Sequence, residues 1–291
     1  MKILLVDELS IMYRYHHAMS RNPLMTGDLN TSAIWGLLSN IIDISLAYDI
    51  DQVIVCGDHP GKTFRHEHFP EYKGQRSERP EEIGIALPHV EYICKVFNMP
   101  FVSIEGLEAD DIIGTYSYEA YNAGHTTYIY SSDKDLCQLV NDRTFVLRNA
   151  KTRQDGYELW DYVKVCDKWC IANPAELIHI LALWGDSSDN YKGLPGCGEK
   201  TASEYIRRYG SIKGLYDNMG DLTQSKMNGL VEYERQVMLC LWLATIRTDV
   251  IHMMPALDTL LENTDFDTAE VKKLLDDYRF DSIYKTLFGE R

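Results

Sequence analysis

Short apolar runs alternate with amphipathic stretches through the first half of the chain. The runs that read as strands are KILLVD, QVIVCGD, PFVSIEG, TTYIYSSD and RTFVLRN. Between them, a helical spacing of apolar residues predicts helices over TSAIWGLLSNIIDISLAY, HVEYICKVF and DDIIGTYSYEAY. Parallel strands need crossover connections, so this alternation predicts an α/β domain with a mainly parallel central sheet flanked by helices.

The strand pattern stops at about residue 170. After it, AELIHILALW, EKTASEYIRRY, SIKGLYDN, GLVEYERQVMLCLWLATI and TAEVKKLLDDYRF have helical spacing and are separated by glycine-rich or polar breaks. We therefore predict an α/β domain over residues 1–170 and a helical region over residues 171–291.

Composition narrows the class of protein. The 291 residues are 45% apolar and 11% aromatic, which is typical of a folded protein and excludes disordered, collagenous and coiled-coil chains. The seven cysteines are scattered without metal-ligand spacing, so neither a disulfide framework nor a zinc site is indicated. No signal peptide or membrane-length apolar run is present, and we expect a cytoplasmic protein that makes no membrane contact. A net charge of −15 argues against a generally basic nucleic-acid surface.

Acidic residues follow the predicted strands directly. They are Asp7, Asp58, Glu108, Asp110, Asp111, Asp133 and Asp135. A parallel sheet would gather its carboxyl ends, and these side chains with them, at one edge. Converging carboxylates repel one another unless protons or cations neutralise them. Oxygen ligands without cysteine or histidine favour Mg²⁺ or Mn²⁺, so a divalent metal site is expected there.

Asp186 and Asp189, three residues apart in GDSSDN, add a second acidic turn. Each acid taken singly has an ordinary structural explanation as a helix cap, a turn residue or a partner of a helix dipole. The metal prediction depends on the joint pattern, because chance decoration of every strand end is improbable.

Two further segments suggest contact with phosphates. Gly193, Gly196 and Gly198 predict a tight turn between two helices, with backbone N–H groups open to a phosphate at the start of the second helix. Lys192, Lys200, Arg207 and Arg208 lie close to that turn in the sequence. In HPGKTFRHEHFPEYKGQRSER, five basic residues and Tyr72 suit contact with a nucleic-acid strand, and a solvated loop is the alternative explanation.

These motifs together resemble those of the 5′-nuclease family, which includes the bacteriophage flap endonucleases and the 5′-nuclease domain of bacterial DNA polymerase I. The resemblance rests on VDELSIMYRYHHAM, GKTFRHEHFPEYKGQR, GLEADD, SSDKD and GDSSDNYKGLPGCGEKTA, and covers about residues 1–215. It implies a PIN-like 5′-nuclease fold, a helical arch over about residues 70–95 and a DNA-binding helix-three-turn-helix element over about residues 185–210. The chain has no room for a polymerase domain, so we expect a stand-alone nuclease.

The resemblance also implies roles for individual residues. All nine acids named above correspond to the family's metal-site acids for two Mg²⁺ ions, with Mn²⁺ as a substitute. Lys73 and Arg76 correspond to arch cations that face the scissile phosphate. The residues implied in DNA binding are Arg14, Tyr72, Lys192, Gly193, Gly196, Gly198 and Lys200, with K⁺ as a further ion at the hairpin. Glu8 departs from the family, which commonly has glycine after the first aspartate, and is expected to alter the metal cleft.

The function expected from the sequence is divalent-metal-dependent hydrolysis near the 5′ ends of DNA, at flaps, nicks or RNA primers. Asp7, Asp58 and Asp110 are expected around one ion, and Asp133, Asp135 and Asp189 around the other. A monomer that works alongside a replicative polymerase, in the host cytoplasm if phage-encoded, fits this function. A PIN-type ribonuclease and a non-catalytic binder of branched DNA are the alternatives.

Overall fold

The computed structural model describes residues 1–150, 156–262 and 265–290. The chain divides into two compact units. Unit 1 comprises Met1–Pro60, Glu78–Ser132 and Thr248–Arg291, and unit 2 comprises Gly61–Ser77 and Asp133–Arg247. This division differs from the expected one at residue 170, because the last segment packs into unit 1 while the residues after Ser132 pack into unit 2.

Unit 1 is built on parallel strands in the order β5-β4-β1-β6. Their bounds are β1 (Lys2–Asp7), β4 (Gln52–Cys56), β5 (Phe101–Val102) and β6 (Thr126–Tyr130). Ile3 to Val6 of the central strand are fully buried, as expected for a strand covered on both faces. The predicted parallel sheet is confirmed, although β5 is shorter than its apolar run because the chain turns at Gly106, where φ is +83°.

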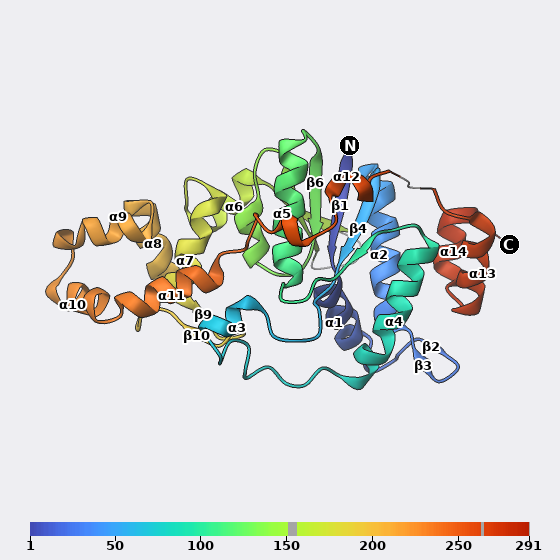
Figure 1. Cartoon of the computed structure of the whole chain (residues 1–291), viewed down its shortest axis with the longest axis horizontal. Coiled ribbons are helices and arrows are strands. Elements are labelled where there is room, and N and C mark those ends of the chain that lie inside the picture. Colours follow the sequence, from blue (N-terminus) through green and yellow to red (C-terminus); the bar gives the residue numbers. More distant parts are fainter. Residues whose placement is uncertain (151–155, 263–264, 291) are drawn as a thin grey trace. The chain divides into compact units, whose positions relative to one another are not determined.

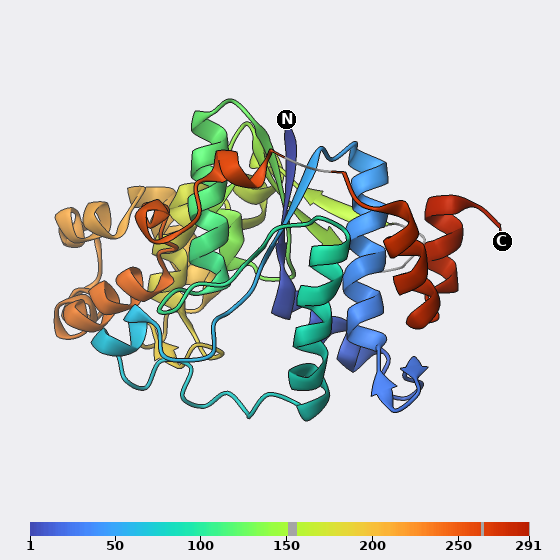
Figure 2. The same ribbon diagram turned by 45° about the vertical axis from the view of Figure 1, so that its right-hand side comes forward.

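Helices cover both faces of this sheet. Helix α5 (Ala109–Asn122) lies on one face, and α2 (Ser32–Tyr48) and α4 (Glu81–Val96) lie on the other (Figures 1 and 2). The remaining elements of unit 1 are α1 (Glu8–Ala18), β2 (Met25–Thr26), β3 (Leu29–Asn30), α12 (Leu257–Leu260), α13 (Thr268–Asp277) and α14 (Asp281–Phe288).

Unit 2 is mainly helical. Helix α7 (Leu177–Trp184) packs against α8 (Glu199–Tyr209) and α11 (Glu234–Ala244). The other elements are α3 (Phe64–His68), β7 (Thr144–Asn149), β8 (Tyr157–Trp160), α6 (Tyr162–Trp169), β9 (Gly185–Asp186), β10 (Tyr191–Lys192), α9 (Ile212–Asp217) and α10 (Gln224–Glu232). Strands β7 and β8 pair antiparallel, as do β9 and β10. The stretch expected as one helix over GLVEYERQVMLCLWLATI is two, α10 and α11, separated at Tyr233.

The helical arch expected over about residues 70–95 is only partly helical. Helix α3 ends at His68 and α4 begins at Glu81, and the residues between them form turns and coil. Pro80, which precedes α4, has no N–H to donate and fixes the start of that helix. Within the described ranges, no helix is both long and apolar enough to cross a membrane.

Candidate active site

The acids of unit 1 lie where its parallel strands end. Asp7 is the last residue of β1 and pairs in register with Cys56, two residues before Asp58. Asp110 and Asp111 stand in the first turn of α5. The strand-end placement predicted for these four residues is therefore observed.

Hydrogen bonds fix two of these carboxylates. Asp7 Oδ2 accepts from the Ser131 hydroxyl at 2.6 Å, and its Oδ1 accepts from the backbone N–H of Ser10 at 3.3 Å. Asp58 Oδ1 accepts from the backbone N–H of Ala109 at 2.7 Å, which ties the end of β4 to the start of α5. These bonds hold both carboxylates at the carboxyl ends of their strands.

Glu108 and Asp111 act as helix caps. They form a reciprocal capping box, in which the Glu108 N–H donates to Asp111 Oδ2 at 3.3 Å and the Glu108 side chain accepts from the backbone of Asp111. Asp111 is fully buried and Glu108 nearly so. The two residues thus cap the start of α5.

Glu8 is an additional buried acid beside this group. Its Oε1 has no hydrogen-bond partner among the described residues, and its Oε2 lies so close to Gly57 that any β-carbon there would clash at 2.7 Å. Burial, and then the negative charges of Asp58, Glu91 and Asp7, raise the pKa of Glu8 to about 8, although Arg79 opposes this. A nearby cation would lower this pKa and favour the ionised form of Glu8.

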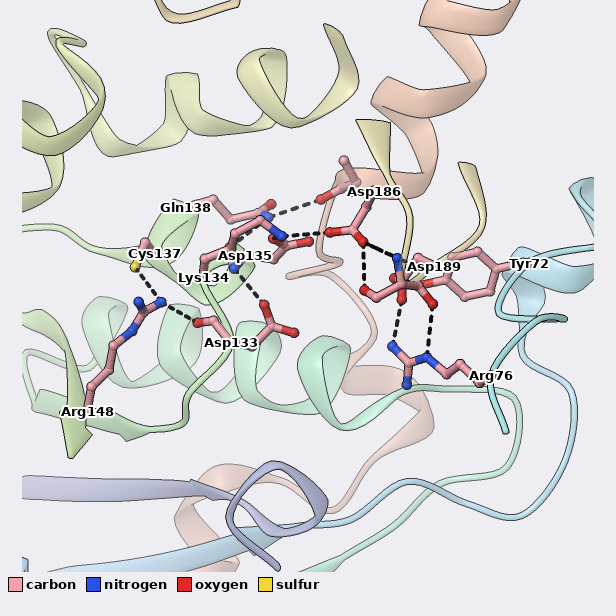
Figure 3. Close-up of polar contacts among 12 residues, drawn as sticks. Tyr72, Arg76, Asp133, Lys134, Asp135, Cys137, Gln138, Arg148, Asp186 and Asp189 are labelled. Carbon is pink, nitrogen blue, oxygen red and sulfur yellow. Dashed lines mark hydrogen bonds and ion pairs between the residues drawn. The ribbon is translucent and has the colours of Figure 1, made fainter. Parts of the chain in front are cut away.

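The acids of unit 2 are Asp133, Asp135, Asp186 and Asp189, shown in Figure 3. Asp133 Oδ1 accepts from the backbone N–H of Asp135 at 2.9 Å, which forms the tight turn expected from their spacing. Asp186 Oδ1 accepts from the N–H and the hydroxyl of Ser188 at 2.7 and 2.6 Å. Asp186 thereby shapes the turn between β9 and β10, on which Asp189 stands.

Lys134 lies among these carboxylates. Its Nζ is 2.6 Å from Asp186 Oδ2 and 3.2 Å from Asp135 Oδ1. Burial, and then the charge of Asp133, raise the pKa of Asp135 to about 7 even though Lys134 opposes the shift. Burial raises the pKa of Asp186 less than its hydrogen bonds from Lys134 and Ser188 lower it, so that pKa falls below its usual value. Nothing in the sequence pattern singled out Lys134, although its place between two site acids was a usable signal.

The segment expected to supply arch cations is joined to the acidic turn of unit 2. Arg76 Nη2 lies 2.6 Å from Asp189 Oδ1, and the Tyr72 hydroxyl donates to Asp189 Oδ2 at 2.8 Å. The backbone N–H of Lys73, which has a φ of +54°, donates to the Asp189 carbonyl at 3.1 Å. Gln75 and Asn190 make further hydrogen bonds between the two segments.

Tyr72 differs from its expected role. The residue is only 2% exposed, so its ring is not presented for stacking on a nucleic-acid strand. Its hydroxyl instead positions Asp189. Sequence alone could not show this contact, because the two residues are 117 positions apart.

The glycine-rich turn has the expected place between α7 and α8. A β-carbon on Gly193 would lie 2.3 Å from the Leu183 carbonyl oxygen, so this glycine allows two backbones to approach. Gly196 has a φ of +75°, and Gly198 is the N-cap residue of α8 and has open space around it. Lys192 and Lys200 are exposed in unit 2, and Arg14 is exposed on α1 of unit 1. Backbone N–H groups at the start of α8 can donate hydrogen bonds to the oxygens of a phosphate.

The chemistry of the acids suits a divalent cation, although their side chains do not form a complete coordination site. Among the residues that the structure describes, no three acidic, histidine or cysteine side chains are already arranged around an ion position. In unit 2, the buried Asp135 Oδ1 contacts the Lys134 ammonium at 3.2 Å, whereas the buried Tyr191 hydroxyl makes no hydrogen bond to the described residues. An oxygen-only set of this kind fits Mg²⁺ or Mn²⁺.

Comparisons with known proteins agree with this picture. Residues 2–170 match the family model of the 5′-3′ exonuclease N-terminal resolvase-like domain, and residues 172–269 match that of the 5′-3′ exonuclease C-terminal SAM fold. A 5′-3′ exonuclease of Buchnera aphidicola is 32% identical over 277 residues, which cover 89% of each chain. DNA polymerase I of Bacillus subtilis is 34% identical over 251 residues, or 85% of this chain, but the match spans only 28% of that protein.

Solved structures show the same fold. A bacteriophage T5 flap endonuclease, solved as a pseudo-enzyme-product complex with DNA and metal ions, has a TM-score of 0.71 at 23% identity, over 96% of this chain and 100% of that one. The catalytic core of Rad2 in complex with DNA substrate has a TM-score of 0.56 at 18% identity, over 99% of this chain and 87% of that one. At these identities the likeness concerns the fold alone.

Proposed function

Because the chain belongs to the 5′-3′ exonuclease family, we propose that it is a metal-dependent 5′-3′ exonuclease and flap endonuclease that hydrolyses phosphodiester bonds near the 5′ ends of DNA. The observation that carries the proposal is that hydrogen bonds and a helix start hold carboxylates in place in both units. Flaps, nicks and RNA primers are the proposed substrates, and removal of flaps or primers during replication is the proposed role.

In this proposal each unit holds one Mg²⁺ ion, with Mn²⁺ as a substitute. Asp7, Asp58 and Asp110 would hold the ion of unit 1, and Asp133, Asp135 and Asp189 that of unit 2. Glu108, Asp111 and Asp186 would orient these ligands through their caps and turns. When bound, the ions would supply an activated water and stabilise charge on the phosphate and the leaving oxygen.

Lys73 and Arg76 are the proposed cations for the scissile phosphate. Arg76 Nη2 lies 2.6 Å from Asp189 Oδ1. A metal ion that neutralises Asp189 would weaken this ion pair and release the guanidinium for a phosphate. These cations would stabilise a neighbouring phosphate most in the transition state, where its negative charge increases.

The hairpin in unit 2 is the proposed site for duplex DNA. The start of α8 offers N–H groups beside Gly198, and the exposed Lys192 and Lys200 add positive charge. A K⁺ ion at the hairpin is a further part of this proposal. Arg14 on α1 is a further proposed DNA contact.

The relatives support these proposals by what they bind. The T5 flap endonuclease was solved with DNA and metal ions, and another structure of the T5 5′-exonuclease contains zinc. Since several relatives are named DNA polymerase I, we propose that this chain works as a cytoplasmic monomer alongside a replicative polymerase, within a host cell if a phage encodes it.

Cleavage of a 5′-labelled flap duplex tests the proposal. We expect short labelled products in Mg²⁺ and none in EDTA, with slower cleavage of the same strand when it is unpaired. Faster cleavage of a structured RNA than of the flap would favour a PIN-type ribonuclease. Tight binding of the flap without cleavage in Mg²⁺ or Mn²⁺ would favour a non-catalytic binder.

A further inference from the structure

One lysine side chain bridges two acids of unit 2 that come from distant parts of the sequence. Lys134 Nζ lies 2.6 Å from Asp186 Oδ2 and 3.2 Å from Asp135 Oδ1 (Figure 3). Asp135 follows Lys134 directly, whereas Asp186 is 52 positions further along the chain. The ammonium therefore joins the turn after β6 to the turn between β9 and β10.

The position of Lys134 is well defined. Its side chain is only 31% exposed, and Nζ lies 5.4 Å from the centre of the Trp184 ring, which holds the ammonium by a cation–π contact. Asp186 Oδ1 is occupied by two hydrogen bonds from Ser188, which leaves Oδ2 for the lysine.

The charge balance explains why a cation belongs there. Asp133, Asp135 and Asp186 are close enough to perturb one another, and buried carboxylates that repel destabilise the fold unless a positive charge compensates them. Lys134 provides one positive charge, whereas a divalent ion provides two. Lysine is also a compact point charge on a flexible stem, so it can leave a carboxylate without backbone movement.

We propose that Lys134 is a resident counter-cation of unit 2, which holds Asp135 and Asp186 together in the metal-free protein and gives up Asp135 when a divalent cation binds. This inference rests on the proposed function in one respect, that the acids of unit 2 bind a metal ion. Lys134 thus keeps the acids assembled before binding but weakens metal affinity by competing for them. It is a positioning residue for Asp135 and Asp186.

Lys134→Met separates the stabilising effect of Lys134 on the metal-free protein from its competition with the metal ion. Methionine keeps an apolar stem over Trp184 and removes the charge. The variant should unfold at a lower temperature than the wild type in EDTA, since the acids lose their counter-charge. It should bind Mn²⁺ about tenfold more tightly, which is about 1.4 kcal/mol, because the ion no longer displaces a competitor. Lys134→Arg, which keeps the charge, should restore the melting temperature in EDTA.

Isothermal titration with Mn²⁺ alone, in an Asp110→Asn background that weakens binding in unit 1, measures the affinity of unit 2. Lys164→Met is the matched control, because Lys164 pairs with Glu158 at 2.6 Å on an exposed part of the same unit. The control should leave Mn²⁺ affinity unchanged. Equal or weaker Mn²⁺ binding by Lys134→Met would overturn displacement, and an unchanged melting temperature in EDTA would overturn the counter-cation role.

These outcomes also separate this inference from the proposed function. If the protein without any substitution binds no Mn²⁺, the proposed metal-dependent function fails, and displacement fails with it. The counter-cation role is then still decided in EDTA by a double-mutant cycle between Lys134→Met and Asp186→Asn. Coupling between the two substitutions in the cycle supports the role, and additive effects overturn it.

Discussion

The guanidinium of Arg76 lies 2.6 Å from Oδ1 of Asp189, and the Tyr72 hydroxyl donates to Oδ2 of the same carboxylate at 2.8 Å. Half of the Arg76 side chain is exposed, whereas Tyr72 is buried. The two contacts therefore differ in strength. An exposed ion pair contributes at most about 1 kcal/mol, while loss of a buried hydrogen bond also leaves a polar group without its partner.

Tyr72→Phe should lower the free energy of unfolding by about 1 to 2 kcal/mol in EDTA, because Asp189 loses a donor inside the protein. Urea unfolding followed by fluorescence measures this change. Tyr118→Phe is the control, since that ring is 50% exposed, and it should change stability by less than about 0.5 kcal/mol. Equal stabilities of Tyr72→Phe and the wild type would show that the contact does not position Asp189.

Lys73→Ala should slow the chemical step more than it weakens DNA binding, if the lysine acts on charge that develops in the transition state. Single-turnover cleavage at saturating enzyme should fall by about a hundredfold or more, with the dissociation constant changed by less than about threefold. The backbone contact from Lys73 to the Asp189 carbonyl should survive in this variant. An unchanged single-turnover rate with weaker binding would instead assign Lys73 to substrate capture.

Gly198→Val should reduce duplex affinity without unfolding the protein, because the space around Gly198 is open and its φ is ordinary. The β-branched side chain would obstruct approach of a phosphate to the start of α8. Gly193→Val should instead destabilise the fold, since its β-carbon would clash with the Leu183 carbonyl. Lys200→Ala should reduce the slope of log affinity against log salt by about one.

Binding measurements on duplex and single-stranded DNA separate these effects. Gly198→Val should lose affinity for duplexes of any sequence and keep slow activity on short single strands. Equal loss on both substrates would mean that Gly198 supports the fold rather than a phosphate contact.

Glu8 should make the metal-free protein less stable as pH rises. The pKa of Glu8 is about 8 in the folded protein and has an ordinary value of 4.5. The contribution of protonated Glu8 to the free energy of unfolding is therefore complete below about pH 4.5 and lost as pH approaches 8. Glu8→Gln should therefore flatten the decline of unfolding free energy in that window by up to about 1.4 kcal/mol per pH unit. Urea unfolding in EDTA across that window measures it. Identical slopes for both proteins would contradict burial of a protonated Glu8.

The strands and helices around the strand-end acids were predictable because their apolar spacing is strong and local. β1, α2, β4, α5 and β6 all lie where the pattern put them. β8 and α6 were missed, since β8 is only four residues long and is stabilised by pairing with β7 rather than by its own composition. The hairpin of β2 and β3 was also missed, because its strands are short and are stabilised by pairing with each other.

The acids were predictable, but their partners were not. Position after a strand identifies Asp7 or Asp133 as a candidate, because topology alone brings strand ends together. The contacts from Ser131 to Asp7, from Tyr72 to Asp189 and from Lys134 to Asp186 join residues 52 to 124 positions apart, and only the packed chain shows them.

The acids of both units should be needed for cleavage and not for folding. Asp110→Asn and Asp133→Asn test one unit each, and asparagine keeps the acceptor that Asp133 offers to the N–H of Asp135. Melting temperatures in EDTA should hold or rise, because each substitution removes a repelling charge. A clear fall in melting temperature together with retained cleavage would indicate a structural role for the acid concerned.

The most direct test is single-turnover cleavage of a 5′-flap DNA as a function of Mg²⁺ concentration, for the wild type and these two variants. It tests the mechanism in which the acids of each unit hold one metal ion. We expect no wild-type cleavage in EDTA, saturable activation by Mg²⁺, and at least about a hundredfold loss in each variant at saturating Mg²⁺ with flap affinity retained. Cleavage at the wild-type rate by either variant, or wild-type cleavage that persists in EDTA, would contradict the mechanism.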